Sequence, residues 1–164
     1  MMIKYFAKIL IFAIILLASC TSNNDSCGEL FDMRLTVGFY EIIDNDSVYS
    51  LKSLSIDSIT VNGQGNDSIL YNNTKRVSSI KLPLKKFDTE TTFEISFNDT
   101  IDIITISYTN NEPHFVSLEC GCEVFHTIDT ITTTHNYIDY VEVVNREINI
   151  NSQNAENIKI YRFR

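Results

Sequence analysis

The residues of this chain that could do chemistry are cysteines and histidines that fall close together in the sequence. Cys120, Cys122 and His126 form a C-x-C-x3-H pattern, and His114 and His135 lie nearby. Thiolate and imidazole groups would suit Zn(II) or Cu(I), although the spacing matches no common zinc motif. A redox role for Cys122 is a second interpretation, but the chain has no Cys-x-x-Cys. Both compete with a structural interpretation, in which one disulfide forms and one thiol stays sheltered.

A disulfide is the structural role we expect for these cysteines in an oxidising compartment. Cys120 and Cys122 are two residues apart, so in a strand they point to one face with their Cβ atoms too far apart to bridge. A bond from Cys27 to either of them is therefore favoured. It would close a loop of about 95 residues, nominally worth about 4–5 kcal/mol in the chain-entropy account.

The sequence contains none of the common catalytic signatures, such as G-x-S-x-G, a P-loop, G-x-G-x-x-G or H-E-x-x-H. Asp44-Asn45-Asp46 begins like a calcium loop but lacks its glycine and its final glutamate. Tyr137 and Tyr140 could line a glycan site, although half-buried strand positions are the commoner role of such residues. We therefore expect a protein that is not an enzyme and that needs no cofactor or metal.

The N-terminal residues have the layout of an export signal. Lys4 and Lys8 precede the apolar run Ile9 to Leu17. Leu17-Ala18-Ser19-Cys20 resembles the bacterial lipobox, in which a signal peptidase cuts before a cysteine that has received a diacylglycerol. A membrane-spanning helix is the alternative, but the run is about half of the roughly 20 residues that a span needs. We expect Cys20 to carry palmitate or related acyl chains, which together hold a protein stably to a lipid bilayer.

Composition and charge narrow the class of protein further. The chain has 164 residues, is 44% hydrophobic and carries a formal net charge of −8, which suits one folded domain. Loss of Lys4 and Lys8 with the signal would take the charge from −8 to −10. This acidity argues against nucleic acid as a partner, and it leaves the lipid to supply the membrane affinity.

Alternation of apolar and polar residues predicts strands in most of the remaining chain. Met33, Leu35, Val37 and Phe39 share one face, as do Phe93, Ile95 and Phe97. Residues 101–106 are apolar on both faces and predict a central strand that is buried twice, whereas 41–56 could hold a helical turn. We expect an antiparallel β-sandwich, immunoglobulin-like or similar, of about seven to nine strands. The domain boundaries that follow are a signal peptide at 1–19, a lipidated tether at 20–32 and one β-sandwich domain at 33–164.

A short triplet, Asp followed by Ser or Thr and then Ile or Val, recurs in the chain. Asp and Ser cap turns through local hydrogen bonds, so the triplets are expected to mark the starts of strands. They occur at Asp46-Ser47-Val48, Asp57-Ser58-Ile59, Asp67-Ser68-Ile69, Asp99-Thr100-Ile101 and Asp129-Thr130-Ile131.

Several segments together resemble a family of small Bacteroidota lipoproteins that is grouped as a domain of unknown function. The segments are Leu17-Ala18-Ser19-Cys20, Cys27, Leu35 to Tyr40, Asp67 to Leu70, Ile80 to Leu84, Ile103 to Tyr108, Phe115 to Gly121 and Ile158 to Tyr161. The resemblance implies a Gram-negative envelope and a Cys27–Cys120 disulfide, with Cys122 as the spare cysteine. It also implies O-glycosylation in the triplets, on at least one of Ser47, Ser58, Ser68, Thr100 and Thr130, but it brings no activity.

The function expected from the sequence is that of a membrane-anchored envelope lipoprotein with a structural or interaction role. Its partners would be the bilayer, through Cys20, and an unknown envelope protein or glycan, at the periplasmic face of the outer membrane or at the cell surface. The alternative is a glycan-binding or small-ligand-binding module that assists an uptake system. A concave tyrosine-rich patch would favour the alternative, and a buried cluster of histidines with carboxylates would revive an enzyme.

Overall fold

The computed structural model describes residues 30–31, 33–45, 48–65, 68–117, 121–152 and 155–163. These residues form fourteen β-strands and one short 3-10 turn. The strands are β1 Leu30–Phe31, β2 Arg34–Asn45, β3 Val48–Ser53, β4 Ile56–Gly63, β5 Ile69–Val77, β6 Ser79–Pro83, β7 Glu90–Phe97, β8 Thr100–Asn110, β9 His114–Ser117, β10 Gly121–Glu123, β11 His126–Thr133, β12 Tyr140–Val143, β13 Glu147–Ile148 and β14 Ile158–Phe163, and the 3-10 turn is Ile150–Ser152. The expected all-β class is confirmed, with more strands than the seven to nine expected. In the part of the chain described here, no helix is long and apolar enough to cross a membrane.

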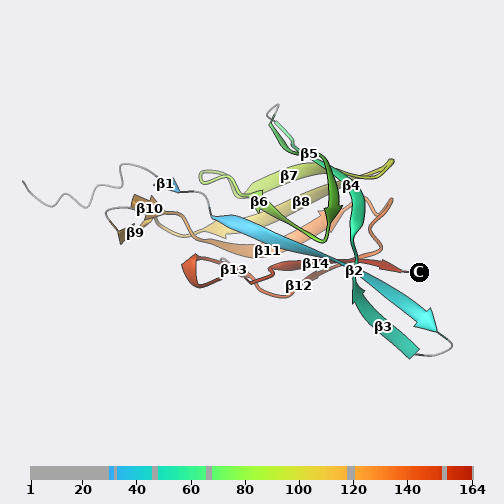
Figure 1. Ribbon diagram of the computed structural model, residues 1–164. Coiled ribbons are helices and arrows are strands. Elements are labelled where there is room, and N and C mark those ends of the chain that lie inside the picture. The colour runs from blue at the N-terminus through green and yellow to red at the C-terminus, as the bar shows by residue number, and fades with distance from the viewer. Residues whose placement is uncertain are drawn as a thin grey trace, which may run out of the picture.

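The strands form two large sheets and one small sheet. The first large sheet has the order β13-β11-β8-β7-β4-β5, and the second has the order β12-β14-β2-β3 with β6 paired to β2. The small sheet, β1-β10-β9, lies at one end of the molecule, and the β2–β3 hairpin extends from the opposite end (Figure 1). Most neighbours are antiparallel, as expected, but β1 with β10 and β14 with β2 are parallel pairs.

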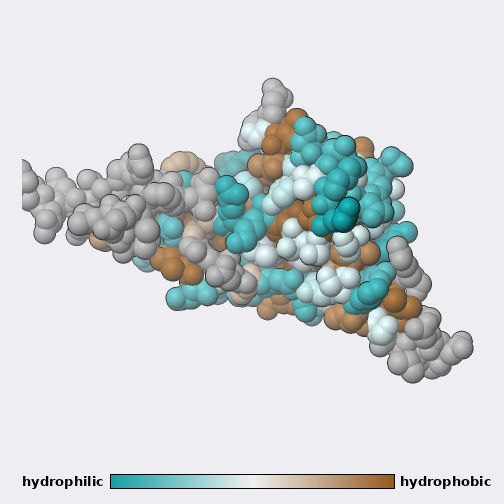
Figure 2. Space-filling view, in the orientation of Figure 1, coloured by the Kyte–Doolittle hydropathy of each residue, from teal (hydrophilic) through white to brown (hydrophobic). Residues whose placement is uncertain are grey.

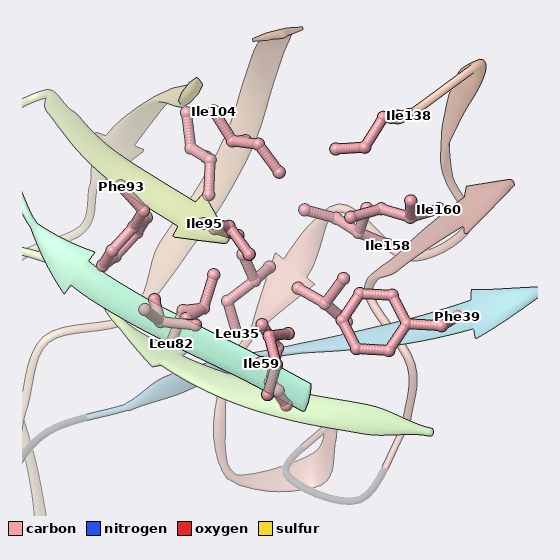
Figure 3. Packing of buried hydrophobic residues seen from close by; sticks show 14 of the residues in the cluster. Leu35, Phe39, Ile59, Leu82, Phe93, Ile95, Ile104, Ile138, Ile158 and Ile160 are labelled. Atoms are coloured by element: carbon pink, nitrogen blue, oxygen red, sulfur yellow. The ribbon is translucent and has the colours of Figure 1, made fainter. Parts of the chain in front are cut away.

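The core lies between the two large sheets and is built from the alternating residues that the sequence singles out. Leu35, Val37 and Phe39 of β2 and Phe93, Ile95 and Phe97 of β7 are all buried. Side chains from both sheets point toward one another in Figure 3. The rings of Phe39 of β2 and Phe97 of β7 meet edge to face, with their centroids 5.7 Å apart. This edge-to-face contact is a favourable geometry for aromatic rings and joins the two sheets directly.

Strand β8 corrects the expectation of a strand buried on both faces. Ile104 and Ile106 are buried in the core, but Ile101 and Ile103 are exposed. β8 is central in its sheet by hydrogen bonding, yet only one face of that sheet is covered by the second sheet. The helical turn expected within 41–56 is also wrong, because the described residues of this segment continue β2, form β3 and begin β4.

β2 is the longest of the described strands. The strands that pair with it set how far the second sheet extends. On one edge it pairs with β14. On the other edge its first half pairs with β6 and its second half with β3. The second half thereby carries the hairpin beyond the sandwich and leaves a broad outer surface across β12, β14, β2 and β3.

Candidate functional site: a tyrosine groove

Three tyrosines form a row across the outer face of the second sheet. Tyr140 of β12 is opposite Tyr161 of β14, and Tyr161 is opposite Tyr40 of β2. Residues paired directly across a sheet share a face, so the rings follow one another, with centroids 5.8 Å apart for Tyr140–Tyr161 and 5.9 Å apart for Tyr161–Tyr40. Tyr161 is only 6% exposed although it lies outside the core cluster, whereas Tyr140 is 53% exposed. The row therefore ends in an open aromatic face.

The register places an apolar row beside the tyrosines, on the side of the β2–β3 hairpin. Phe163 of β14 is opposite Ile42 of β2, which is opposite Leu51 of β3. Phe163 is 53% exposed and Leu51 is 54% exposed. Figure 2 shows hydrophobic surface at the base of this hairpin. An outer sheet face normally carries polar residues, so this concentration of exposed apolar side chains is unusual.

A charged row borders the tyrosines on the other side, and a groove lies between the apolar and charged rows. Glu142 of β12 is opposite Lys159 of β14, which is opposite Gly38 of β2. The groove has a volume of about 340 Å³ and is lined by Ile42, Ser50, Leu51, Tyr140, Glu142 and Tyr161. It therefore combines aliphatic side chains and two tyrosine rings with one serine hydroxyl and one carboxylate.

Two tyrosine–carboxylate hydrogen bonds fix the row. The Tyr161 hydroxyl donates to Glu142 Oε2 at 2.5 Å, and the Tyr40 hydroxyl donates to the Glu156 carboxylate, with both oxygens within 2.9 Å. Burial, together with the bond to Glu142, raises the pKa of Tyr161, and the bond to Glu156, together with burial, raises the pKa of Tyr40. Both phenols therefore stay neutral and donate. Lys159 Nζ lies 5.1 Å from the centre of the Tyr40 ring, so a cation already covers that ring.

The small size of Gly38 permits this arrangement. A Cβ atom at Gly38 would collide with Glu156 Oε1 and would lie 2.9 Å from Tyr40 Cε2. The Glu156 carboxylate and the Tyr40 ring thus occupy the space above the glycine, and a larger residue would displace them.

A buried carboxylate holds the loop that leads into β12 and so positions Tyr140. Asp102 of β8 is fully buried and accepts hydrogen bonds from the Thr134 hydroxyl and from the backbone N–H groups of Asn136, Tyr137 and Ile138, at 2.6–3.0 Å. Burial alone would raise the pKa of Asp102, but these four hydrogen bonds outweigh it and lower the pKa. The inward position of an aspartate in a central strand is explained by this loop.

Comparison with known proteins gives a family but no activity. Residues 58–162 match a family of unknown function, DUF6452. The chain belongs to this family. No curated protein and no solved structure matches the chain. The DUF6452 match covers Tyr140, Glu142 and Tyr161 of the groove but begins after the residues of β2 and β3.

The two tyrosines that the sequence offered as glycan contacts have different surroundings in this DUF6452 protein. Tyr140 lines the groove, as that hypothesis required. Tyr137 instead stacks on Phe97 at 4.7 Å, and Arg162 covers its ring at 5.0 Å. Tyr137 therefore supports the core, which is the ordinary structural role weighed against a glycan contact.

The histidines of the metal hypothesis are separated and individually engaged. His126 is buried and its Nδ1 lies 2.6 Å from Asn110 Oδ1. His114 stacks on Phe125, and His135 Nδ1 lies 3.0 Å from the Ile138 carbonyl. Among the described residues, no group of three His, Cys, Asp or Glu side chains could hold a metal ion.

The cysteines are only partly within the described residues. Cys20, Cys27 and Cys120 lie outside them, so the lipidated cysteine stays a prediction and neither cysteine of the expected Cys27–Cys120 pair is described. Cys122 is fully buried and disulfide-bonded, and its partner lies outside the described residues. The expectation that Cys122 is the spare cysteine is therefore wrong.

The triplets mark strand starts at two of the described positions. Ser68 immediately precedes β5, and Thr100 begins β8. Ser58 lies inside β4, where it hydrogen-bonds Asn73, and Thr130 lies inside β11 at a register shift. Ser47 is outside the described residues. The turn interpretation thus explains part of the set, and Ser68 and Thr130 are the most exposed hydroxyls in it.

Sequence reasoning missed the rest of the groove, namely Ile42, Ser50, Leu51, Glu142 and Tyr161, and it missed Tyr40 at the end of the tyrosine row. A signal for it was present in two strands. In β2, the buried residues Leu35, Val37 and Phe39 occupy every second position and share one face. Tyr40 and Ile42 occupy the alternate positions and therefore lie on the opposite face. In β14, Ile158 and Ile160 share one face, and the next large apolar residues, Tyr161 and Phe163, lie on the opposite face. A change of phase within one strand indicates apolar residues on both faces, and here the second face is solvent-exposed.

Proposed function

We propose that this DUF6452 protein is a lipid-anchored, non-enzymatic envelope protein whose β-sandwich acts by binding a partner in the cell envelope. The anchor is supported by the Leu17-to-Cys20 motif behind an apolar segment. The origin in a Bacteroidota outer membrane is supported by the resemblance, which extends over nearly the whole mature chain. A Cys20→Ala variant should remain as the longer precursor and take up no labelled fatty acid, and unchanged labelling would refute the anchor.

The tyrosine groove is the observation that carries the binding role. Half-exposed Tyr140, Leu51 and Phe163 share one outer face, where their exposure to water is unfavourable in the isolated molecule. The phenols beneath them are held by carboxylates in one geometry. A rigid concave surface of apolar side chains with a few fixed polar groups is typical of ligand sites.

A carbohydrate is the ligand class that this chemistry fits best. A sugar ring presents an apolar face of C–H groups, which suits the electron-rich face of the exposed Tyr140 ring. Its hydroxyl groups donate well to a carboxylate, and Glu142 supplies one at the groove wall, beside the Ser50 hydroxyl. The volume of about 340 Å³ is near the lower end of the usual range for ligand sites, which suits one or two sugar units. The acidic lining and the net charge of −8 disfavour an anionic ligand.

A glycan array followed by titration calorimetry tests this proposal. Tyr140→Ala should weaken binding about tenfold or more, which corresponds to about 1.4 kcal/mol, because the stacking surface is lost. Tyr140→Phe is the matched control that keeps the ring and should bind nearly as well. Glu142→Gln should weaken binding, whereas Phe87→Ala, an exposed aromatic outside the groove, should not. Binding of neutral sugars that is indifferent to Tyr140→Ala would refute the groove as their site.

A further inference from the structure

The connection between β6 and β7 presents the most exposed large hydrophobic side chain in the described part of the chain. Phe87 is 86% exposed and lies between Lys86 and Asp88. A single exposed apolar residue needs no explanation by itself. Phe87 differs because side chains of β8 hold the backbone on both sides of it.

Tyr108 and Asn110 of β8 fix this connection. The Tyr108 hydroxyl accepts a hydrogen bond from the Lys85 N–H and donates to the Lys85 carbonyl, each at 2.9 Å. Asn110 Nδ2 donates to the Lys86 carbonyl at 3.0 Å and to the Asp88 carbonyl at 2.7 Å. Three backbone carbonyls close to Phe87 thus accept hydrogen bonds from β8, so the exposed ring lies on a loop whose backbone is fixed.

The loop lies at the end of the molecule from which the chain leads back to Cys20. Figure 1 shows the β6–β7 connection on the side of β1, β9 and β10. Burial raises the pKa of Glu123 in β10, and the nearby positive charge of Lys86 offsets part of that rise. Glu123 is in turn paired with Phe31 of β1. Phe115 of β9, in the same small sheet, is 49% exposed.

The length of the N-terminal segment limits how far this end can be from a membrane. β1 begins at Leu30, ten residues after Cys20, and ten extended residues span at most about 35 Å. This step rests on the proposed lipid anchor. With acyl chains on Cys20, the end that carries Phe87 and Phe115 is the end nearest the bilayer.

We propose that Phe87, together with Phe115 at the same end of the molecule, inserts into the headgroup region of the bilayer that holds the anchor. Aromatic side chains favour this region because part of the ring leaves water without entering the hydrocarbon core. Lys85 Nζ is 3.2 Å from Asp88 Oδ2, so the loop carries little unpaired charge and the contact does not require anionic lipid. The contact would orient the sandwich so that the β2–β3 hairpin and the tyrosine groove point away from the bilayer.

A tryptophan reporter tests the contact, since the chain has no tryptophan of its own. The full-length, acylated Phe87→Trp protein is reconstituted into phosphatidylcholine vesicles, with and without phosphatidylglycerol. Its emission should shift to shorter wavelength in both and be quenched by lipids brominated close to the headgroup. Phe163→Trp, at the far end of β14, is the matched control and should keep a solvent-exposed spectrum.

The outcomes separate this inference from the anchor. An intact mass without acyl chains refutes the anchor and this inference together. Correct acylation with unchanged Phe87→Trp emission overturns the bilayer contact and leaves the anchor standing. Emission that shifts only when an envelope protein extract is added also overturns it, because the loop would then be a protein-binding site.

Discussion

Removing the Asp102 carboxylate should destabilise the fold and disorder the wall of the groove together. The carboxylate is fully buried and accepts four hydrogen bonds at 2.6–3.0 Å from residues 134–138. Hydrogen bonds to a charged group contribute about 1.5–3 kcal/mol each, but they do not add fully, because water can reach the freed N–H groups. We expect Asp102→Ala to lower the free energy of unfolding by about 3–5 kcal/mol, which is less than the full sum of four such bonds.

The measurement is urea unfolding followed by circular dichroism. Asp102→Asn, which retains one acceptor oxygen, should fall between Asp102→Ala and the unmodified chain. Asp57→Ala removes an exposed aspartate and should change stability by less than about 0.5 kcal/mol. A loss below about 1 kcal/mol for Asp102→Ala would refute the role assigned to this carboxylate. The groove gives a second readout, because Tyr140 follows the loop by two residues and should bind ligand less tightly once the loop is freed.

The lowered pKa of Asp102 gives this prediction a pH dependence. A carboxylate whose pKa is lower in the folded protein than in the unfolded chain stabilises the fold above the unfolded value, about 3.9. That contribution should be lost as the pH falls through the folded pKa, which lies below the ordinary value. The Asp102→Asn variant should lack this component of acid destabilisation, whereas Asp57→Ala should retain it.

Three further results are expected. Gly38→Ala should destabilise by about 1–3 kcal/mol, as overpacking does, and should also weaken groove binding, because the new Cβ displaces Glu156 from Tyr40; full retention of both would contradict the packing described. Non-reducing peptide mapping should link Cys27 to Cys122, because Leu30 pairs with Cys122 across β1 and β10; a Cys27–Cys120 link would show instead that the pairing implied by the sequence resemblance was right. The intact mass of O-deacylated protein from its native host should exceed that of the polypeptide with its lipid remnant, by glycan on at least one of Ser47, Ser58, Ser68, Thr100 and Thr130, and a mass without this excess would leave only the turn interpretation.

The sequence predicts the core of this protein well because alternation reports burial on one side of a strand. Leu35, Val37 and Phe39 keep that alternation and are buried. The pattern fails where polar and apolar residues exchange roles. Asp102 occupies an inward position because a distant loop satisfies its carboxylate, and Ile103 faces solvent in a central strand. Neither outcome depends on local sequence.

The candidate site was only partly predictable for a related reason. Tyr140 was singled out from residue type, but its neighbours Tyr161 and Tyr40 come from strands that are distant in sequence. The parallel pairing of β14 with β2 brings them together. Composition does not predict which residues lie opposite one another across two strands. The two tyrosine–carboxylate bonds, Tyr161 to Glu142 and Tyr40 to Glu156, likewise join residues whose proximity depends on that pairing.

Methyl NMR of the isotope-labelled protein during titration with a bound oligosaccharide tests the central claim most directly. The account predicts that the methyl signals of Ile42 and Leu51, which line the groove beside Tyr140, shift with saturation, while those of Ile101 and Ile103 on the outer face of the other sheet do not. Shifts confined to Ile101 and Ile103, or unchanged Ile42 and Leu51 signals at saturating ligand, would contradict it.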